Sequence, residues 1–234
     1  MKEYKIHVED RSIVTPGDLI AEGAINAQGS FYREGNKIFA KQVSLVEIKK
    51  NKIKITPLTG PYIPKEGDFV IGKIVEVGFS GWLVDLGTYF MVNLPLREAV
   101  DEYIDVLTTD LSKYYDIGDI IAAKVINVPK SMLIQLSVKD KGLGKLVGGT
   151  LVEVEPTKVP RVIGREGSMV KMMKEITKAK ILVGQNGYIW IKAPAEVTQI
   201  LARAIYIIEK ESHRSGLTDK IRRFLEEEMT RIKK

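Results

Sequence analysis

Two glycines separated by two residues form the clearest chemical feature of this chain. Gly164 and Gly167 enclose Arg165 and Glu166, and Ser168 follows as a residue type that favours a helix N-cap. Glycines at both ends of a short loop allow a tight turn and let a phosphate backbone approach the main chain. The amides that begin the next helix would then point at a phosphate oxygen. The spacing therefore predicts an anion-binding loop.

Basic residues near this loop supply positive charge for the same chemistry. Arg165 lies inside the loop, and Lys171 and Lys174 fall on the first turns of the helix predicted to follow. Glu166 opposes them, because a carboxylate repels phosphate. The sequence leaves two interpretations open, a working phosphate grip and a retained tight turn. The binding candidates are Gly164, Arg165, Gly167, Lys171 and Lys174.

Residue types suited to catalysis are sparse. The chain has two histidines, His7 and His213, and no cysteine. The lack of cysteine excludes disulfides, thiolate metal sites and cysteine nucleophiles. We find no Ser-His-Asp set, no paired-carboxylate site and no metal-ligand spacing. We therefore expect a protein that is not an enzyme and has no catalytic residue, metal site or cofactor.

An acidic segment offers one alternative to that expectation. It contains Asp101, Glu102, Asp105 and Asp110 within a polar stretch from about residue 97 to 115. Carboxylates of this kind can bind a divalent metal. These four residues do not fall at a recognisable ligand spacing, so a solvated loop is the favoured interpretation.

The overall composition limits the class of protein. The formal net charge of +6 fits a polyanionic partner without proving one, and a merely basic soluble protein is the alternative. A hydrophobic fraction of 44% is enough to form a core. No apolar run approaches the length of a signal sequence or a membrane span. We expect a soluble, cytoplasmic protein without a membrane partner.

A second group of candidates lies in the middle of the chain. Exposed aromatic side chains beside basic ones hold single-stranded nucleic acid by stacking on its bases. Alternation along a strand sends some aromatics inward, so Phe79 and Trp82 are as easily core as surface residues. The candidates for stacking are Phe79, Trp82 and Phe90, and those for phosphate contact are Arg97, Lys124 and Lys130.

The elements that must position these residues fall into four segments. Residues 1–58 are predicted to form short strands in a small β domain, which either docks on another protein or only packs against a neighbour. A segment rich in Pro and Gly follows. Residues 63–138 show five strands with a long insertion after the third, which is the pattern of an OB barrel. The third strand is expected at 89–94.

The remaining residues alternate helices with strands. Residues 147–214 give the order β-α-loop-α-β-β-α, with Gln185-Asn186-Gly187 as a hairpin turn between the second and third strands. Residues 215–234 form a helix of mixed charge, which is either solvated or a partner contact. The sequence thus predicts a multi-domain fold: a small N-terminal β domain, a β-barrel, an α/β domain and a C-terminal helix.

The middle two segments resemble known RNA-binding domains. Residues 67–138 are similar to an S1 domain, with GDFVIGKI at 67–74, VDLG at 84–87, GD at 118–119 and LS at 136–137. Many S1 domains carry a histidine near the end of the third strand, where this chain has NLPLR, and Arg97 is the candidate substitute. Residues 147–214, with VIGREG at 162–167, resemble a type I KH domain.

A small β domain, an S1 domain and a KH domain in this order resemble the S1/KH cap subunit of the RNA exosome in its archaeal form. The resemblance implies a non-catalytic subunit that binds single-stranded RNA in a trimeric cap. The cap would sit on a ring of RNase-PH-like subunits, with the N-terminal domain docked on the ring. The S1 domains would feed the RNA 3′ end inward, and adenine-rich tails would be preferred.

Two other functions are compatible with these domains. A phosphorolytic nuclease such as polynucleotide phosphorylase carries KH before S1 and needs catalytic domains that this chain lacks, so the domain order argues against it. A free-standing S1/KH RNA chaperone or translation-associated factor would use the same two domains without a ring. Assembly with ring subunits separates this alternative from the cap subunit.

Overall fold

The computed structural model describes residues 4–49, 52–102, 104, 109–214 and 216–232. The chain divides into two compact units, Met1–Pro61 and Tyr62–Lys234. Among the described residues, no helix is both long and apolar enough to cross a membrane.

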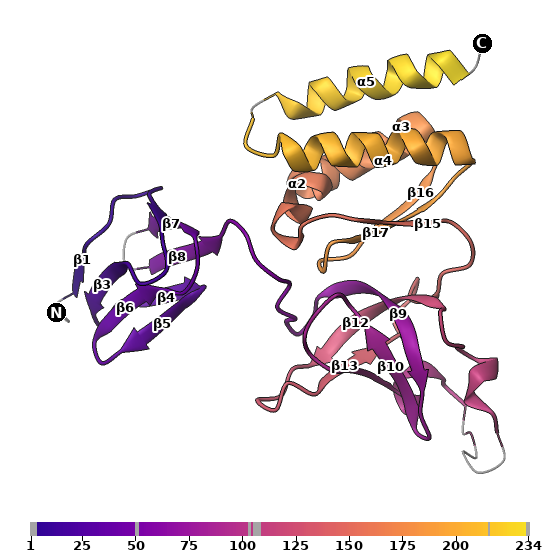
Figure 1. Cartoon of the computed structure of the whole chain (residues 1–234), viewed down its shortest axis with the longest axis horizontal. Coiled ribbons are helices and arrows are strands. Elements are labelled where there is room, and N and C mark those ends of the chain that lie inside the picture. The colour runs from indigo at the N-terminus through magenta and orange to yellow at the C-terminus, as the bar shows by residue number, and fades with distance from the viewer. Residues whose placement is uncertain (1–3, 50–51, 103, 105–108, 215, 233–234) are drawn as a thin grey trace. The chain divides into compact units, whose positions relative to one another are not determined.

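The first unit is a small β domain built from two four-stranded sheets (Figure 1). One sheet has the order β1-β3-β6-β5 and the other β2-β7-β8-β4. Inward-facing aliphatic side chains, among them Ile20, Ile38 and Ile53, form its core. The strands are β1 (Tyr4–Ile6), β2 (Ile13–Val14), β3 (Leu19–Gly23), β4 (Asn26–Gly29), β5 (Phe31–Glu34), β6 (Lys37–Ala40), β7 (Ser44–Lys49) and β8 (Lys52–Pro57).

The second unit begins with a closed, OB-like β-barrel. Its strands follow the order β13-β11-β10-β9-β12, and β12 also pairs with β13, which closes the barrel. The long insertion follows the third strand, as predicted. It contains the short helices α1 (Leu96–Ala99) and η1 (Leu111–Lys113). The barrel strands are β9 (Phe69–Val77), β10 (Gly81–Asp85), β11 (Val92–Pro95), β12 (Ile120–Asn127) and β13 (Ile134–Ser137), and β14 (Gly144–Lys145) pairs with β12.

Strand β9 changes partners along its length. Residues 73–77 pair with β10, whereas residues 69–73 pair with β12. Gly72 lies at the change, and a Cβ there would lie only 2.4 Å from Cγ1 of Val84. Glycine therefore lets the strand curl tightly enough to serve both neighbours.

The second half of this unit is a KH domain. Its sheet has the antiparallel order β15-β17-β16, and helices cover one face of that sheet (Figure 1). The predicted order of helices and strands is confirmed. The elements are β15 (Thr150–Glu153), η2 (Pro156–Lys158), α2 (Val159–Ile163), η3 (Arg165–Gly167), α3 (Ser168–Thr177), β16 (Lys180–Val183), β17 (Tyr188–Lys192) and α4 (Ala195–Lys210).

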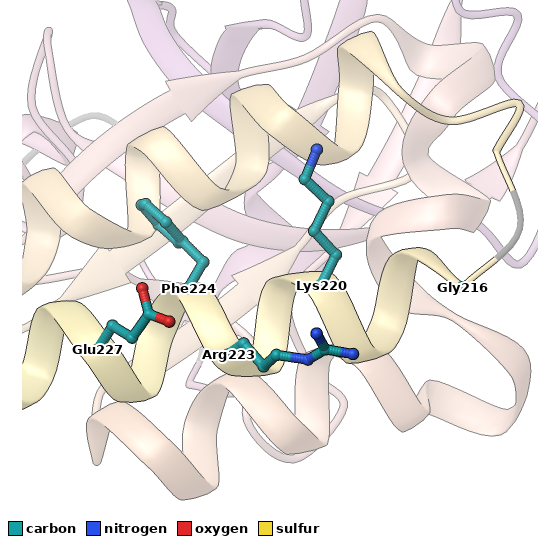
Figure 2. A pocket seen from close by; sticks show the side chains of 5 residues that line it. All are labelled: Gly216, Lys220, Arg223, Phe224 and Glu227. Carbon is teal, nitrogen blue, oxygen red and sulfur yellow. The ribbon is translucent and has the colours of Figure 1, made fainter.

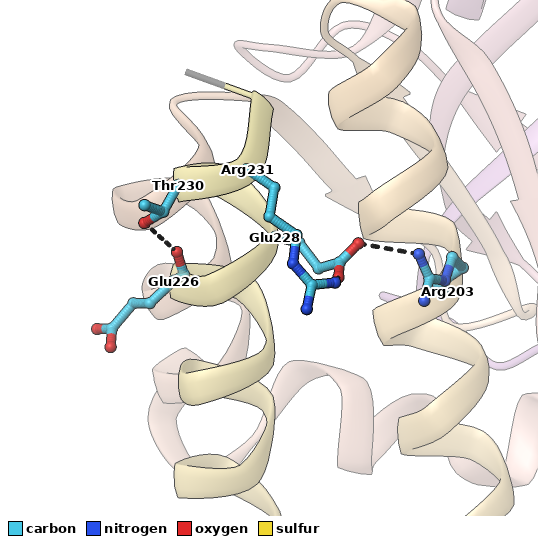
Figure 3. A network of polar contacts seen from close by, with 5 residues as sticks. All are labelled: Arg203, Glu226, Glu228, Thr230 and Arg231. Carbon is cyan, nitrogen blue, oxygen red and sulfur yellow. Dashed lines mark hydrogen bonds and ion pairs between the residues drawn. The ribbon is translucent and has the colours of Figure 1, made fainter. Parts of the chain in front are cut away.

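The C-terminal helix α5 (Leu217–Ile232) packs against α3 and α4. Its apolar side, with Leu217, Ile221 and Leu225, is buried in the KH core. At its end, Glu228 accepts hydrogen bonds from Arg203 of α4 at 3.0 Å and from Arg231 at 2.5 Å (Figure 3). One side of this ion-paired helix is therefore part of the KH domain.

Polar contacts also fasten the start of α5. The ammonium of Lys220 donates to both carboxylate oxygens of Glu211, at 2.6 and 2.8 Å. This hydrogen-bonded cation lowers the pKa of the Glu211 carboxyl below its usual value. Both ends of α5 are thus tied to α4 and the residue that follows it.

The turn between β16 and β17 joins the KH domain to the barrel. Gln185 N–H donates to the carbonyl of Phe69 at 2.8 Å. The Asn186 carboxamide accepts from Ile71 N–H at 3.2 Å and donates to the carbonyls of Ile71 at 2.7 Å and Leu86 at 3.0 Å. These contacts occupy the edge of β9 that β10 leaves unpaired, and buried backbone groups of this kind need partners.

Candidate nucleic-acid interface

The glycine loop of the KH domain has a backbone that its two glycines make possible. Gly164 has φ 76° and Gly167 has φ 77°, both in the region of positive φ that favours glycine. A Cβ on Gly164 would lie 2.7 Å from the amide nitrogen of Met169. Gly167 N–H donates to the carbonyl of Gly164 at 3.2 Å. The loop is therefore a tight turn that leads directly into α3.

The start of α3 differs in one detail from the sequence expectation. Ser168 was expected to be the N-cap, but Gly167 occupies that position and Ser168 is the first helical residue. The expectation is wrong because the left-handed turn at Gly167 brings the chain into the helix one residue earlier. Gly167 supplies no capping side chain to this ten-residue helix, and the N–H of Ser168 donates to the carbonyl of Arg165.

Glu166 adopts a conformation unusual for its residue type. Its φ of 53° and ψ of 28° lie in the left-handed region, where a non-glycine residue is strained. Both Glu166 and Arg165 are exposed to solvent. The carboxylate therefore stands on the outer surface of the loop, beside the positive charges that would attract a phosphate.

The structure brings the KH candidates together. Lys171 and Lys174 are three residues apart on the exposed side of α3, so they share one helix face. The Cε atom of Lys171 lies 3.8 Å from the position that a Cβ of Gly167 would take. Arg165, Lys171 and Lys174 thus lie at or beside the glycine loop, as the spacing predicted.

Trp82 is the clear correction among the barrel candidates. Its ring is fully buried, and its Nε1–H donates to the carbonyl of Tyr115 at 2.8 Å. The Tyr115 ring meets it edge-on, with 5.2 Å between ring centroids. The expectation of an exposed stacking residue is wrong because the alternation of β10 turns Trp82 and Val84 inward.

Phe79 and Arg97 lie near each other at one end of the β10–β11 hairpin. Phe79, in the turn before β10, has 67% of its surface exposed. Leu96 N–H donates to the carbonyl of Ser80 at 2.9 Å, which joins the start of α1 to that turn. The Arg97 side chain is 76% exposed, with Glu98 at 4.0 Å. This end of the hairpin thus carries an exposed aromatic ring and an exposed guanidinium on two segments that are joined by a backbone hydrogen bond.

The remaining barrel candidates lie elsewhere. Phe90 is half-buried and packs against the barrel core, and Lys124 is paired with Asp140 at 2.9 Å. Lys130 is exposed in the turn between β12 and β13. Ile134 N–H donates to the carbonyl of Met91, which places that turn near the other end of the β10–β11 hairpin. The six candidates therefore do not form one cluster.

The sequence reasoning missed three exposed residues at this second end. Tyr89 is 90% exposed, Met91 60% and Leu133 57%. The third strand was expected to begin at residue 89, but β11 begins at Val92, so that boundary is wrong. Thr88 accepts a hydrogen bond from Phe90 N–H and holds residues 88–90 as a loop instead. A short aromatic run next to a glycine was the available signal.

The acidic insertion holds no metal cluster among the residues that the structure describes. Asp110 accepts from Ser112 N–H at 3.0 Å and caps η1. Hydrogen bonding from the Ser112 side chain, and then from its backbone, lowers the pKa of the Asp110 carboxyl. Asp101 lies 3.8 Å from Lys139, and Glu102 is exposed. Asp105 lies outside the described residues.

Neither the histidines nor the surface hollows add a reactive site. His7 lies 3.8 Å from Glu22, and His213 is exposed. A hollow of about 280 Å³ lies along α5 (Figure 2). Its lining contains none of the candidates above, and consists of Gly216, Lys220, Arg223, Phe224 and Glu227.

Several known proteins are similar to this chain over most of its length. "Exosome complex component Rrp4" of Pyrococcus horikoshii is 47% identical over 233 residues, which cover 98% of this chain and 88% of that protein. The protein of the same name from Methanopyrus kandleri is 44% identical, covering 94% of this chain and 95% of its own length. A crystal structure described as an exosome complex RNA-binding protein has a TM-score of 0.69 and 39% identity, covering 75% of this chain and 100% of the other.

The fold and the exposed glycine loop define a multi-domain protein of the KH class. Two family models support this class: one described as "Exosome RNA binding protein RRP4 N-terminal domain" matches residues 11–59, and one described as "KH domain" matches residues 149–197. With the full-length similarity above, the chain belongs to the family of the exosome complex component Rrp4.

Proposed function

We propose that this protein is a non-catalytic, RNA-binding cap subunit of an exosome, acting in the cytoplasm. The observation that carries the proposal is near full-length similarity to relatives named as exosome components, together with an exposed glycine loop beside free cations. We propose the domain limits 1–58 for docking, 63–138 for the S1-type barrel, 147–214 for the KH domain and 215–234 for the C-terminal helix.

The KH loop binds a phosphate of single-stranded RNA in this proposal. Gly164 and Gly167 let the sugar-phosphate backbone approach, and amides of the first turn of α3, which has no capping side chain, donate to a phosphate oxygen. Arg165, Lys171 and Lys174 add positive charge. Glu166 weakens the grip but faces solvent, where water and salt screen its charge.

The barrel supplies a second contact. Phe79 stacks on a base while Arg97 pairs with a neighbouring phosphate, and Tyr89 provides a further stacking ring in place of the buried Trp82. At about 3.3 Å per residue, the five residues of β10 separate the two ends of the hairpin by roughly 13 Å. A strand of a few nucleotides can therefore cross the barrel from one ring to the other. Phe90 and Lys130 lie toward the Tyr89 end of this path, whereas Lys124 is already paired with Asp140.

The barrel contact is tested by removing one ring. Phe79→Ala and Arg97→Ala are each expected to weaken binding of single-stranded RNA about fivefold or more at low salt, measured by fluorescence anisotropy. Tyr206→Ala is the matched control, because Tyr206 is 60% exposed on α4 and lies outside both candidate sites. Unchanged affinity in both barrel variants would exclude this surface as an RNA contact.

Assembly is the second part of the proposal. Three copies form a cap on a ring of RNase-PH-like subunits, the N-terminal β domain docks on that ring, and the barrels direct the RNA 3′ end inward, with adenine-rich RNA preferred. The match of residues 11–59 to the N-terminal domain of an exosome RNA-binding protein supports the docking role.

Light scattering tests the assembly directly. Size-exclusion chromatography of the full chain with RNase-PH-like ring subunits should yield one large complex containing both. A chain that remains separate from the ring subunits, yet binds RNA, would instead be a free-standing RNA chaperone. Nuclease activity of the purified chain alone would contradict its non-catalytic role.

A further inference from the structure

The outer surface of α5 carries a row of charged side chains whose sign alternates from one residue to the next. The row consists of residues four apart in the sequence, and side chains at this spacing form a continuous ridge along a helix. The apolar side of α5 packs against α3 and α4, so the ridge is directed away from the KH core. This charged row is defined as Asp219, Arg223, Glu227 and Arg231, all of which are exposed.

The two central charges of the row have no ion-pair partner among the residues that the structure describes. The described ion pairs of α5 use Lys220, Glu228 and Arg231 instead. Arg223 and Glu227 are correctly spaced to pair with each other along the helix. A cation that precedes an anion by four residues is, however, the less favourable order for such a pair. Both groups therefore remain available to another molecule.

Two hollows border the charged row. One, of about 280 Å³, reaches from the row to Lys220 and Phe224 (Figure 2), and the other, of about 400 Å³, reaches from it to Glu226 and Thr230. With 3.6 residues per turn, these two pairs of residues lie on opposite sides of the row. Partly buried Phe224 gives the first hollow an apolar wall. A ridge with a hollow on each side has the shape that packs against the ridge of a second helix.

The alternation of sign makes the charged row complementary to a second copy of itself. Arg223 and Glu227 lie two residues to either side of Leu225, and Asp219 and Arg231 lie six residues to either side of it. When two copies of α5 cross antiparallel at Leu225, Arg223 of one copy faces Glu227 of the other. The same crossing brings Asp219 opposite Arg231, so every contact joins unlike charges. A parallel crossing would instead place each charge against the same charge of the other copy, which is repulsive.

We propose that the charged row and its two hollows are a docking surface for α5 of a second copy of this chain, with the two helices antiparallel. A two-fold contact of this kind uses the same surface on both copies, so assembly at this site stops at two chains. The inference goes beyond the proposed function and does not depend on it, because none of the RNA-binding candidates belongs to the row. Exposed ion pairs contribute little individually, so we expect half of the chains to be paired at about 100 μM.

Sedimentation velocity of the full chain, without RNA or ring subunits, measures this pairing. The parent chain should show a monomer–dimer equilibrium at low salt, and high salt should weaken the dimer about tenfold or more. Arg223→Glu brings carboxylates face to face at the central contacts, and Glu227→Arg does the same with guanidinium groups. Each variant alone should therefore pair about tenfold or more weakly than the parent chain.

An equimolar mixture of these two variants provides a sharper measurement. In a mixed pair each central contact again joins a carboxylate to a guanidinium, so heterodimers should form although neither variant pairs with itself. The double variant that combines Arg223→Glu with Glu227→Arg should pair as the parent chain does, because the exchange keeps the row complementary to itself. A merely structural role of either residue would not produce these two recoveries.

Two controls accompany the charge reversals. Lys41→Glu makes the same change of net charge at an exposed position in the first compact unit, and it should leave pairing unchanged. Thermal unfolding of every variant should match the parent chain, since the substituted side chains are on the surface.

Three outcomes overturn the inference: a parent chain that stays monomeric at low salt, a mixture of the two variants that stays monomeric, or an equal loss of pairing in Lys41→Glu. A monomeric parent chain whose RNA affinity falls in Arg223→Glu would assign this cation to RNA and would also overturn it. Failure of the parent chain to bind RNA is a different result, because it contradicts the proposed function and leaves the pairing of α5 unaffected.

Discussion

The KH domain contains two tetrapeptides with glycine at both ends, and they serve opposite purposes. In Gly164–Gly167 the two middle residues are exposed, and the loop leads into a helix that has no capping side chain. In Gly184–Gly187 the middle Asn186 is buried and makes three hydrogen bonds to the barrel. The first tetrapeptide faces a ligand, and the second holds two domains together.

The comparison teaches that the glycines set the backbone and the residues between them set the role. Gly184 must be small because a Cβ there would lie 2.4 Å from Oδ1 of Asn186 and 2.9 Å from the nitrogen of Ile71. Gly164 must be small because the chain reverses into α3 directly above it. Similar patterns thus arise from close approach to a neighbouring domain in one case and to the following helix in the other.

The largest expected effect is on the buried turn. Asn186→Ala removes the partners of one buried N–H and two carbonyls, so we expect a loss of about 3 kcal/mol in the free energy of unfolding. Denaturant unfolding measures it. Gln185→Ala is the matched control, because its side chain is exposed and only its backbone contacts the barrel, so stability should change by less than about 0.5 kcal/mol. Equal losses of unfolding free energy in the two variants would show that the Asn186 side chain does not hold the domains together.

A smaller stability effect, but a clear binding effect, is expected in the exposed loop. Gly164→Ala forces a side chain into a backbone with positive φ and against Met169, at a cost of about 2 kcal/mol. The loop should rearrange, and RNA affinity should fall about tenfold in anisotropy titrations. Retention of full affinity would mean that the loop is only a turn.

The next prediction, with a smaller expected effect, concerns positive charge beside the exposed loop. Lys171→Ala should weaken RNA binding by about threefold at every sequence and lower the slope of log affinity against log salt by about one. Lys210→Ala, an exposed lysine at the end of α4, is the control and should leave that slope unchanged. A salt slope unaffected by loss of Lys171 would place the phosphate contact elsewhere.

The smallest effect concerns Glu166. Glu166→Gly relieves a left-handed non-glycine conformation, which adds stability of about 0.5 kcal/mol after the entropy cost of glycine. It also removes an anion from the loop, so RNA affinity should rise by about twofold. Thermal unfolding and anisotropy measure the two changes. Weaker RNA binding would show that the carboxylate takes part in recognition.

Much of the fold could be predicted because it depends on local patterns. Period-two alternation predicted the barrel strands, and the glycine loop between apolar segments predicted the helices of the KH domain. Trp82 was misplaced because alternation shows which residues share a face but not which face is inside. The start of β11 was misplaced because aromatic residues 89–91 favour a strand by propensity, and the loop at Thr88 overrides it.

The contact that Asn186 makes with the barrel could not be predicted from the spacing of residues in the sequence. The hairpin turn was predicted from residues 185–187, but its partners Ile71 and Leu86 lie 115 and 100 residues away along the chain. A local pattern indicates a turn and carries no information about a distant partner.

The edge of β9 that Gln185 and Asn186 cover in the folded protein is uncovered while the chain is being synthesised. Leu86 leaves the ribosome 100 residues before Asn186, which is roughly 5–20 s at ordinary elongation rates. From the time its last strand, β13, has emerged until Asn186 follows, the nascent barrel exposes backbone groups that can pair with another chain. A messenger that ends before codon 186 would release a barrel in this state, and such a product should aggregate or be degraded even though every barrel strand is present.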